Sequence, residues 1–427
     1  MSGPAVQEGL PPAVLATIDW LKGRFGAYYK ARPPPMPDRF TRREFGFILW
    51  PDRPGPPPFV RHRAYADAAR FHNYLAWKGP HSVYYSTAYY RRPGELKMAD
   101  KQWLGAELIF DLDADHLPEA EAAKAEGAAM PIEEQLRRVK GHFKRLLDDF
   151  LFGDFGLDEK DVWITFSGGR GYHAHVVDPR LLGLDARARR EIVDHVTGKV
   201  PAERGTDTPD LDFFIRKEAV AVDGRGRFAK TLTTERIAPM DAPGWAGRLT
   251  RSLVETLRTR VLEADPAAAR AWLTSMEGIG DKSAEAFLDD FDEARLRRIG
   301  QGFLEQGKVV KRVCHHILAQ HAIPFAKGET DEPVTADVKR LIRLPGSLHG
   351  KSGLRVVTLT RDTLDGFDPF RDAVAFSLDP VDFVPRADDE VRLAGETVRV
   401  RAGEAMEVPE AHAVWWCSRR SGTVGPQ

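Results

Sequence analysis

Two aspartates, Asp111 and Asp113, end an apolar segment of the sequence that begins at Glu107. Side chains two residues apart on a strand point to the same face, so a strand here would project both carboxylates together. Carboxylates held that close repel each other unless a cation or a proton neutralises them, and hard oxygen ligands suit Mg²⁺ or Mn²⁺. The pair therefore predicts a metal site, and a strand that ends in a solvated acidic turn is the alternative.

A glycine-rich turn follows a second apolar segment, residues 162–166, and ends at His173. Glycines let the backbone approach an anion closely, and the N–H groups of such a turn can cradle phosphate oxygens. Ser167, Arg170 and His173 add side-chain donors. The turn has neither a Walker ending nor Rossmann spacing, so a tight hairpin with incidental polar groups is the alternative.

A third polar segment extends from Asp331 to Lys351 and carries a second acid, Asp337. Residues 338–344 are predicted to be helical, and Pro345 would end that helix and leave the last cations on a loop. A solvated basic helix end is the alternative. The cations of the segment are Lys339, Arg340, Arg343, His349 and Lys351.

Together these three segments contain the groups needed for two-metal nucleotidyl transfer. The paired aspartates would bind the metals, and the glycine-rich turn with the basic segment would bind a triphosphate. One metal would activate a 3′-hydroxyl, and the other would steady the α-phosphate and the departing pyrophosphate.

Alternating helical and strand patterns around these segments predict an α/β or α+β core. From about residue 183 to 328 the pattern changes to long helices, which predicts a helical subdomain inserted into the sheet domain. Beyond residue 385, two strands are predicted at 391–393 and 397–401. In the core, helices are predicted at 11–30, 64–77 and 132–152, and strands at 45–50, 59–63, 83–90, 107–113, 162–166, 174–177 and 354–359.

The composition of the 427 residues excludes several classes of protein. With 42% hydrophobic and 29% charged residues the chain is neither wholly disordered nor collagen-like, and 2 Cys cannot build a disulfide scaffold or a four-cysteine zinc module. No apolar run approaches the roughly 20 residues that cross a bilayer, and no signal-peptide pattern is seen, so we expect no membrane partner and a cytoplasmic location. The net charge of −1 gives no global indication of a nucleic-acid partner, which a local patch would have to hold.

The three motifs, in this order, resemble those of the small catalytic subunit of the archaeo-eukaryotic DNA primase. The matching patterns are Asp-x-Asp at 111–113, Ser-Gly-x-x-Gly-x-His at 167–173 and the closing segment 343–351, and residues 43–47 and 60–61 are also similar. The resemblance covers roughly residues 11–180 and 329–380. It implies an α+β fold with a mixed-sheet primase catalytic core (the prim fold) flanked by helices. That core would comprise 1–182 plus 329–385, with a mainly helical subdomain at 183–328 and a C-terminal extension at 386–427.

The resemblance also implies roles for individual residues. Asp111 and Asp113 would be metal ligands, and the third catalytic carboxylate lies 18 residues before the motif histidine, as Asp331 does before His349, with Asp337 and Asp115 as competitors. Two further active-site residues would be Glu44 and Arg61. The residues expected to hold the incoming triphosphate are Ser167, Arg170, His173, Arg343, His349 and Lys351.

The activity implied is template-directed synthesis of short primers on single-stranded DNA, a nucleotidyl transfer of the DNA-directed RNA polymerase type. The substrates would be NTPs or dNTPs, the cofactor Mg²⁺ or Mn²⁺, and the partner a primase large subunit in a heterodimer. One alternative is a repair- or plasmid-type primase-polymerase of the same superfamily, although this chain has no motif for the helicase or ligase domains often fused to those enzymes. The second alternative is a non-catalytic nucleic-acid-binding subunit. The intact sets of carboxylate residues and phosphate-binding residues argue against this alternative.

One departure from the family pattern concerns zinc. Family members typically carry a Cys/His zinc knuckle soon after the Asp-x-Asp strand, but residues 116–135 contain no Cys. We therefore expect no structural zinc. The remaining soft-ligand cluster is interpreted as incidental helix residues, and it comprises Cys314, His315, His316 and His321.

Three further segments are candidates for contacts with DNA or a partner. Residues 276–284 resemble a helix-hairpin-helix turn, which commonly meets DNA phosphates, although a plain inter-helix turn is equally compatible. Tyrosines and arginines at 84–92 would offer stacking surfaces to a single strand, with buried strand tyrosines as the alternative. The pair Trp415 and Trp416 would serve either packing or a partner contact.

Overall fold

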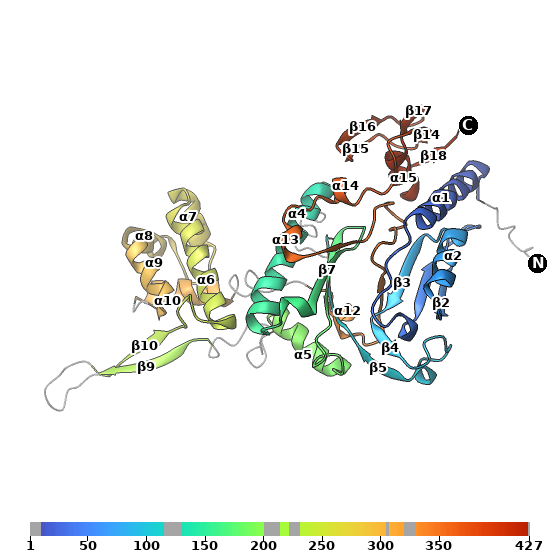
Figure 1. The fold of residues 1–427 in the computed structure, drawn as a ribbon. Coiled ribbons are helices and arrows are strands. Elements are labelled where there is room, and N and C mark those ends of the chain that lie inside the picture. Colours follow the sequence, from blue (N-terminus) through green and yellow to red (C-terminus); the bar gives the residue numbers. More distant parts are fainter. Residues whose placement is uncertain are drawn as a thin grey trace, which may run out of the picture. The chain divides into compact units, whose positions relative to one another are not determined.

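A computed structural model of the chain describes residues 10–114, 130–199, 214–221, 231–304, 307–319 and 330–425 (Figure 1). The chain forms two compact units. Unit 1 consists of Met1–Phe143, Leu157–Glu191 and Thr330–Gln427, and unit 2 of Lys144–Gly156 and Ile192–Glu329. All three motifs that predict chemistry therefore belong to unit 1.

The first sheet of unit 1 carries the aspartate pair and the glycine-rich turn. Its strands are ordered β13-β7-β8-β6, and each neighbouring pair is antiparallel. Strands β6 and β7 run in the same direction but do not pair, because β8 returns from β7 through the glycine-rich turn and lies between them. The strands are β6 (Leu108–Asp113), β7 (Val162–Phe166), β8 (Gly171–Val176) and β13 (Val357–Leu359).

The second sheet of unit 1 has the order β12-β3-β1-β2, again with antiparallel pairs throughout. The α+β class is thus confirmed, but the expected mixed sheet is not seen, since every strand pair in the described ranges is antiparallel. The strands are β1 (Phe45–Ile48), β2 (Phe59–Arg63), β3 (Ser82–Ser86) and β12 (Leu341–Arg343).

Strand β12 corrects the prediction of a helix at 338–344. Leu341 pairs with Ser86 and Ile342 with Tyr85, and the Ile342 side chain is buried. The basic residues of this segment suit an exposed helix as well as they suit a strand. Its conformation is therefore decided by pairing with β3, a strand that is distant along the sequence. A ladder of hydrogen bonds to that partner outweighs the weak local preference.

The predicted strand at 83–90 is two strands. After β3 the chain leaves the sheet at Thr87, whose N–H donates to Arg340, and β4 (Ala88–Tyr90) pairs instead with β5 (Trp103–Ala106). The side chains of Tyr85, Tyr89 and Tyr90 are buried. These three rings are therefore core residues, so the alternative of buried strand tyrosines holds for them.

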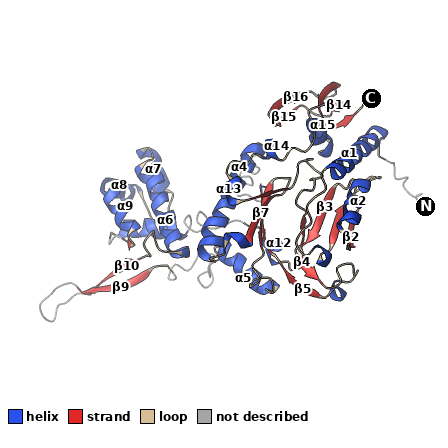
Figure 2. Cartoon of the chain, in the orientation of Figure 1, coloured by secondary structure: helices blue, strands red, loops and turns tan. Residues whose placement is uncertain are grey.

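Helices cover the sheets of unit 1 (Figure 2). Helix α2 begins at Ala68, four residues later than predicted, because Asp67 caps it by accepting from the N–H of Arg70. It ends at Gly79, whose φ of +47° and close approach to Lys22 of α1 both exclude a side chain. Leaving aside the C-terminal region, the helical segments that begin in unit 1 are α1 (Pro12–Ala31), α2 (Ala68–Lys78), α4 (Ile132–Arg145), α5 (Ala186–Thr197), α12 (Glu332–Ala336), α13 (Arg361–Leu364) and α14 (Pro369–Asp372), with short turns η1 (Phe40–Arg42), η2 (Met98–Lys101) and η5 (Glu159–Asp161).

The C-terminal region is an ordered part of unit 1. Trp415 and Trp416 lie buried on helix α15, and Trp416 donates its indole N–H to Asp389 at 2.8 Å, so both rings serve packing. A Cβ on Gly353, at φ +71°, would lie 2.3 Å from Val414, which shows how tightly α15 presses on the loop after β12. The elements are β14 (Pro380–Pro385), β15 (Asp389–Leu393), β16 (Glu396–Val400), β17 (Met406–Pro409), α15 (Glu410–Ser418) and β18 (Gly422–Val424), with sheet order β17-β14-β18 and a β15-β16 hairpin.

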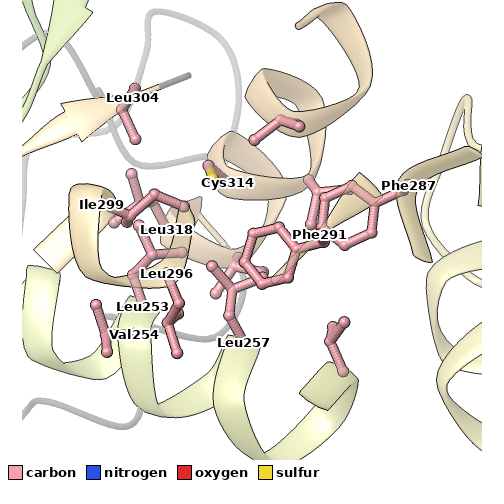
Figure 3. Close-up of a cluster of buried hydrophobic side chains, with 14 of the residues drawn as sticks. Leu253, Val254, Leu257, Phe287, Phe291, Leu296, Ile299, Leu304, Cys314 and Leu318 are labelled. Carbon is pink, nitrogen blue, oxygen red and sulfur yellow. The ribbon is translucent and has the colours of Figure 1, made fainter. Parts of the chain in front are cut away.

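Unit 2 is mainly helical and has its own apolar core (Figure 3). Cys314 lies in that core beside apolar side chains, while the neighbouring His315 bonds to Glu235 at 3.0 Å. His321 lies outside the described residues. The α-helices of unit 2 are α6 (Gly244–Leu257), α7 (Pro266–Thr274), α8 (Asp281–Asp290), α9 (Glu293–Gly300) and α10 (Lys308–Ile317). The unit also contains two π-helical segments, η4 (Leu146–Asp154) and η7 (Arg258–Leu262), and a sheet of β9 (Arg216–Ala221), β10 (Thr231–Arg236) and β11 (Phe303–Leu304).

The turn between α7 and α8 is the segment that resembles a helix-hairpin-helix. Met276 and Ile279 are buried under it, and Gly278 has a φ of +75°. Arg312 donates a hydrogen bond to the carbonyl of Gly278. DNA contact at this turn stays a prediction. None of the described helices is long and apolar enough to span a membrane.

Gly171 gives a direct test of how closely β8 must approach β6. A Cβ there would lie 2.2 Å from the carbonyl oxygen of Leu112, so Gly171→Ala forces the two strands apart. We expect it to lower the free energy of unfolding by about 1–3 kcal/mol, as overpacking does, and to lower activity through displacement of the aspartates. Thermal melting followed by circular dichroism measures the loss.

Gly141→Ala is the matched control, because Gly141 lies on the exposed face of α4 with open space around it. Alanine there should be neutral or stabilise by up to about 1 kcal/mol. Equal stability of the Gly171→Ala protein and the wild type would contradict the strand approach described here.

Candidate active site

Asp111 and Asp113 lie on the same face of β6, as the spacing predicts, while Leu112 between them is buried. Strand β8 sets Asp111 opposite His173 and Asp113 opposite Gly171. From far along the sequence, the N–H of Asp331 donates to the carbonyl oxygen of Asp111 at 2.9 Å. The first and third motifs therefore meet through the backbone.

The acids concentrate negative charge around Asp111. Burial, then Asp113, then Asp331 raise the pKa of Asp111 to about 7, and Arg340 and Arg343 only partly oppose them. The Asp111 side chain is 21% exposed, so a ligand can still reach it. Asp337 is exposed and its carboxylate accepts from the N–H of Lys339 at 2.8 Å. The geometry thus favours Asp331 over Asp337 as the third carboxylate, and Asp115 lies outside the described residues.

A partly buried carboxylate with two acidic neighbours fits a divalent cation, which would offset two of the three negative charges. Within the described ranges, no three His, Cys, Asp or Glu side chains lie close enough to enclose an ion by themselves. A divalent cation bound here would therefore need to take part of its ligands from water or substrate phosphates. Most of the segment 116–135, where the zinc knuckle was expected to be missing, lies outside the described residues.

Ser167 determines the shape of the glycine-rich turn. Its hydroxyl oxygen accepts from the backbone N–H groups of Gly169 at 3.3 Å and Gly171 at 3.2 Å, and the residue is buried. Two of the N–H groups expected to cradle phosphate are therefore already bonded within the turn. The surrounding side chains would therefore have to supply part of the binding of any phosphate held here.

The glycine-rich turn packs directly on the loop that carries His349. A Cβ on Gly169 would lie 2.9 Å from Nε2 of His349, and a Cβ on Gly168, at φ +75°, would lie 2.8 Å from its Cβ. Ser352 fastens the two segments by donating to the carbonyl of Gly168 at 2.5 Å. The second and third motifs are therefore one structure, which only glycine at 168 and 169 permits.

Cations surround this joint loop. Arg343 donates to the hydroxyl of Tyr84 at 3.0 Å, which fixes its guanidinium. Burial, followed by Arg343, His81, Arg419 and Lys351, lowers the pKa of His349 well below its usual value. His349 is therefore neutral within a cationic cluster.

Arg419 is a member of this cluster that the sequence did not reveal. Its guanidinium stacks 3.7 Å from the centre of the Trp415 ring, and burial followed by Arg170 lowers its pKa to about 10. It remains charged at neutral pH. The four-residue spacing from Trp415 to Arg419 indicates a stacked pair on a helix, but nothing local places that pair beside Arg170.

Glu44 and Arg61 are brought together, as a pair. The fully buried Glu44 carboxylate accepts from Arg61 at 3.1 Å and from the N–H of His62 at 3.0 Å, and Lys101 lies 3.4 Å from its other oxygen. The carboxylate is thus inaccessible from solvent, and its Oε1 is occupied by Arg61 and His62. The bond holds Arg61 in place, and the Arg61 side chain is 36% exposed.

A family model described as DNA primase small subunit matches residues 110–361, more than half of the chain. The chain belongs to the DNA primase small subunit family. The resemblance seen in the motifs is thereby confirmed, and it extends well beyond the residues that carry it.

Curated members of the DNA primase small subunit family match almost end to end. The proteins named DNA primase small subunit PriS of Methanothrix thermoacetophila, Methanococcoides burtonii and Halorubrum lacusprofundi are 40%, 37% and 38% identical to this chain. Each alignment covers 96% of this chain, and 99%, 100% and 99% of the respective relatives.

Membership of the primase small subunit family gives the chain its general function. It is the catalytic subunit of a DNA primase, a nucleotidyltransferase that acts in DNA replication. The family implies catalysis with a divalent metal, and the name small subunit implies a large-subunit partner.

The charge around Asp111 predicts a pH-dependent stability of the metal-free primase subunit. The folded pKa of about 7 lies above the ordinary 3.8, so the native state keeps a proton that the unfolded chain has lost. Stability should therefore fall as the pH rises between these values, by up to about 4 kcal/mol, and stay low above them. Asp111→Asn should remove this loss and melt higher than the wild type at about pH 8 in EDTA.

Asp337→Asn serves as the control, since it removes an acid from the same segment without touching Asp111. It should keep the wild-type pH dependence. If Asp111→Asn melted like the wild type at every pH, the assigned charge repulsion would be absent.

Proposed function

We propose that this chain synthesises short primers de novo on a single-stranded DNA template, joining NTPs or dNTPs with the help of Mg²⁺ or Mn²⁺. The single observation that carries the proposal is the meeting of the three motifs. Asp331 bonds to the backbone of Asp111, and the glycine-rich turn packs on His349. A carboxylate centre and a cationic loop then face one reaction site, as nucleotidyl transfer needs.

Asp111, Asp113 and Asp331 would hold the divalent cations. When bound, these ions supply activation of a 3′-hydroxyl and stabilise the charge that develops on the α-phosphate and the departing pyrophosphate. The protein supplies the alignment, since β6 fixes two of the carboxylates and the Asp331–Asp111 backbone bond fixes the third. The partial burial of Asp111 strengthens its attraction for a cation.

The triphosphate would be held by cations rather than by free turn N–H groups. Arg170, Arg343 and Lys351 come from the second and third motifs, and Arg419 joins them from the C-terminal region. Guanidinium groups bind phosphate oxygens bidentately, and their stacking on Tyr84 and Trp415 limits the side-chain entropy lost on binding. Ser167 would act on the nucleotide indirectly, through the shape of the turn.

The carboxylate assignment is tested by comparing Asp331→Asn with Asp337→Asn in primer synthesis on unprimed single-stranded DNA. We expect Asp331→Asn to lower kcat at least about 100-fold, since removal of a group that acts only in the transition state costs that much or more. Asp337→Asn should keep near wild-type activity. The opposite result would assign the third ligand to Asp337.

The same assay separates primer initiation from primer extension. A large subunit should be present in one arm, because the family name implies that partner. Synthesis only from pre-annealed primers, with or without the partner, would favour a primase-polymerase of the repair or plasmid type. Normal initiation by folded Asp111→Ala would exclude the metal assignment altogether.

Arg419 provides an independent test of the triphosphate cradle. Arg419→Ala removes a cation next to Arg170, so we expect the KM for the nucleotide to rise about 10-fold with a smaller change in kcat. Arg401→Ala, which removes an exposed arginine from the same C-terminal region, is the matched control and should leave KM unchanged. An unchanged KM in both variants would remove Arg419 from the cradle.

A further inference from the structure

A cavity of about 330 Å³, the α1 cavity, lies in unit 1 and outside the predicted motif residues. Val14, Ile18 and Leu21 form one wall, and their spacing places them on one face of helix α1. Residues of the segment 50–57, which is rich in proline, and of the C-terminal segment 417–423 form further walls. A cavity of this volume with mainly apolar walls has the dimensions of a small-molecule site.

The charged side chains that line the α1 cavity are all arginines, at positions 53, 386 and 420, and no Asp or Glu is among the described residues of its walls. None of the three arginines forms an ion pair within the described part of the chain. Arg386 lies beside Cys417, because its charge opposes the rise to about 12 that burial causes in the pKa of that thiol. Cations without acids beside them attract an anion.

Two polar side chains of the walls are already engaged with the backbone. The indole N–H of Trp50 donates to the carbonyl of Gly79 at 2.7 Å. The hydroxyl of Thr17 donates to the carbonyl of Ala13 at 2.8 Å and accepts from the N–H of Val424 at 3.2 Å. These side chains offer no partner for the polar edge of a nucleobase, and an unpaired polar group is costly to bury. The walls therefore favour an apolar body.

We propose that the α1 cavity binds a small hydrophobic anion, a molecule with a hydrocarbon body, aromatic or aliphatic, and one carboxylate, sulfonate or phosphate group. The body would pack against helix α1 and Trp50. The acidic group would meet Arg386 and Arg420, whose guanidinium groups suit each of these anions.

The α1 cavity shares a wall with the loop that carries Lys351. That shared wall is His81, which lines the cavity and also packs on Gly350, where a Cβ would collide with the imidazole ring. Burial lowers the pKa of His81 to about 4, and so do Arg343 and Lys351 from the proposed triphosphate cradle and Arg420 from the cavity. The ring is therefore neutral at neutral pH, and cations of both sites lie around it.

An anion in the α1 cavity should consequently weaken the binding of triphosphate in the cradle, because two negative ligands would lie on either side of one neutral ring. By reciprocity, triphosphate should weaken the binding of the anion by the same factor. This coupling rests on the proposed function, whereas the anion site itself does not.

Anilinonaphthalene sulfonate, an aromatic sulfonate whose fluorescence rises in apolar surroundings, tests the site in the full chain. We expect saturable binding of one molecule per chain, and loss of that binding in Ile18→Trp, which fills the cavity. Ala16→Trp is the matched control, since Ala16 is exposed on the same helix outside the cavity, and it should bind as the wild type does. Lack of a saturable site, or binding that survives in folded Ile18→Trp, would overturn the proposal.

The double variant Arg386→Gln/Arg420→Asn tests the acidic group and keeps the apolar walls. Asn tolerates the φ of +63° at position 420. The variant should bind the sulfonate at least about 10-fold more weakly, because hydrogen bonds to charged groups are lost. Its affinity for N-phenylnaphthylamine, the same rings without the sulfonate, should stay within about twofold of the wild type.

The matched control for charge is Arg399→Gln/Arg401→Gln, which removes two exposed arginines of the same region that do not line the cavity. It should change neither affinity. Unchanged sulfonate binding in Arg386→Gln/Arg420→Asn, or an equal loss for both compounds, would show that the site does not select an anion.

Titration of the sulfonate at several concentrations of ATP and Mg²⁺ tests the coupling. We expect the apparent Kd of the sulfonate to rise about 3-fold and then reach a plateau. A rise in proportion to the ATP concentration would mean direct competition, which would assign the cavity to nucleotides and overturn the proposed ligand.

Calorimetry of ATP binding on the same sample separates the coupling from the proposed function. An unchanged Kd of the sulfonate despite measured ATP binding would overturn the coupling alone. Absence of ATP binding would refute the triphosphate cradle, and the coupling with it, while the anion site is still decided by the cavity variants.

Discussion

The pairing of β6 with β8 is the constraint on which the rest of the active site depends. It sets Asp111 opposite His173, and the next ladder, from β8 to β7, sets His173 opposite Thr165. A shift of one residue in either ladder would turn these side chains to the other face of the sheet. Gly171 permits the first ladder, since a Cβ there would meet Leu112 at 2.2 Å.

Charge is separated within the site although the chain as a whole is almost neutral. The net charge of −1 hides an acidic centre at Asp111 and a cationic cluster around His349. Arg343 belongs to both, because it moderates the repulsion at Asp111 while its stacking on Tyr84 keeps it in place. Such a local field can hold a triphosphate and its metal ions without making the whole surface basic.

Sequence patterns predicted those helices and strands whose apolar, buried residues recur along the chain in a recognisable pattern. The apolar segments at 107–113 and 162–166 predicted two strands of the catalytic sheet, and the spacing of apolar residues predicted α1 and α4. The same reasoning failed at 338–344, where a basic segment forms β12 because β3 lies beside it. It also left Trp415 and Trp416 undecided, since the choice between packing and exposure depends on what surrounds α15.

The sequence by itself determined the aspartate pair and, through the resemblance of its three motifs, the family and the α+β class that the family implies, because each motif is a set of residue types at fixed short spacings. Only the tertiary structure brought Asp331 to Asp111 and placed Arg419 beside Arg170. Those contacts link segments that are distant along the chain. The physical reason is that distances between such segments, and the direction of a hydrogen bond between them, are set by strand register and packing rather than by local preference.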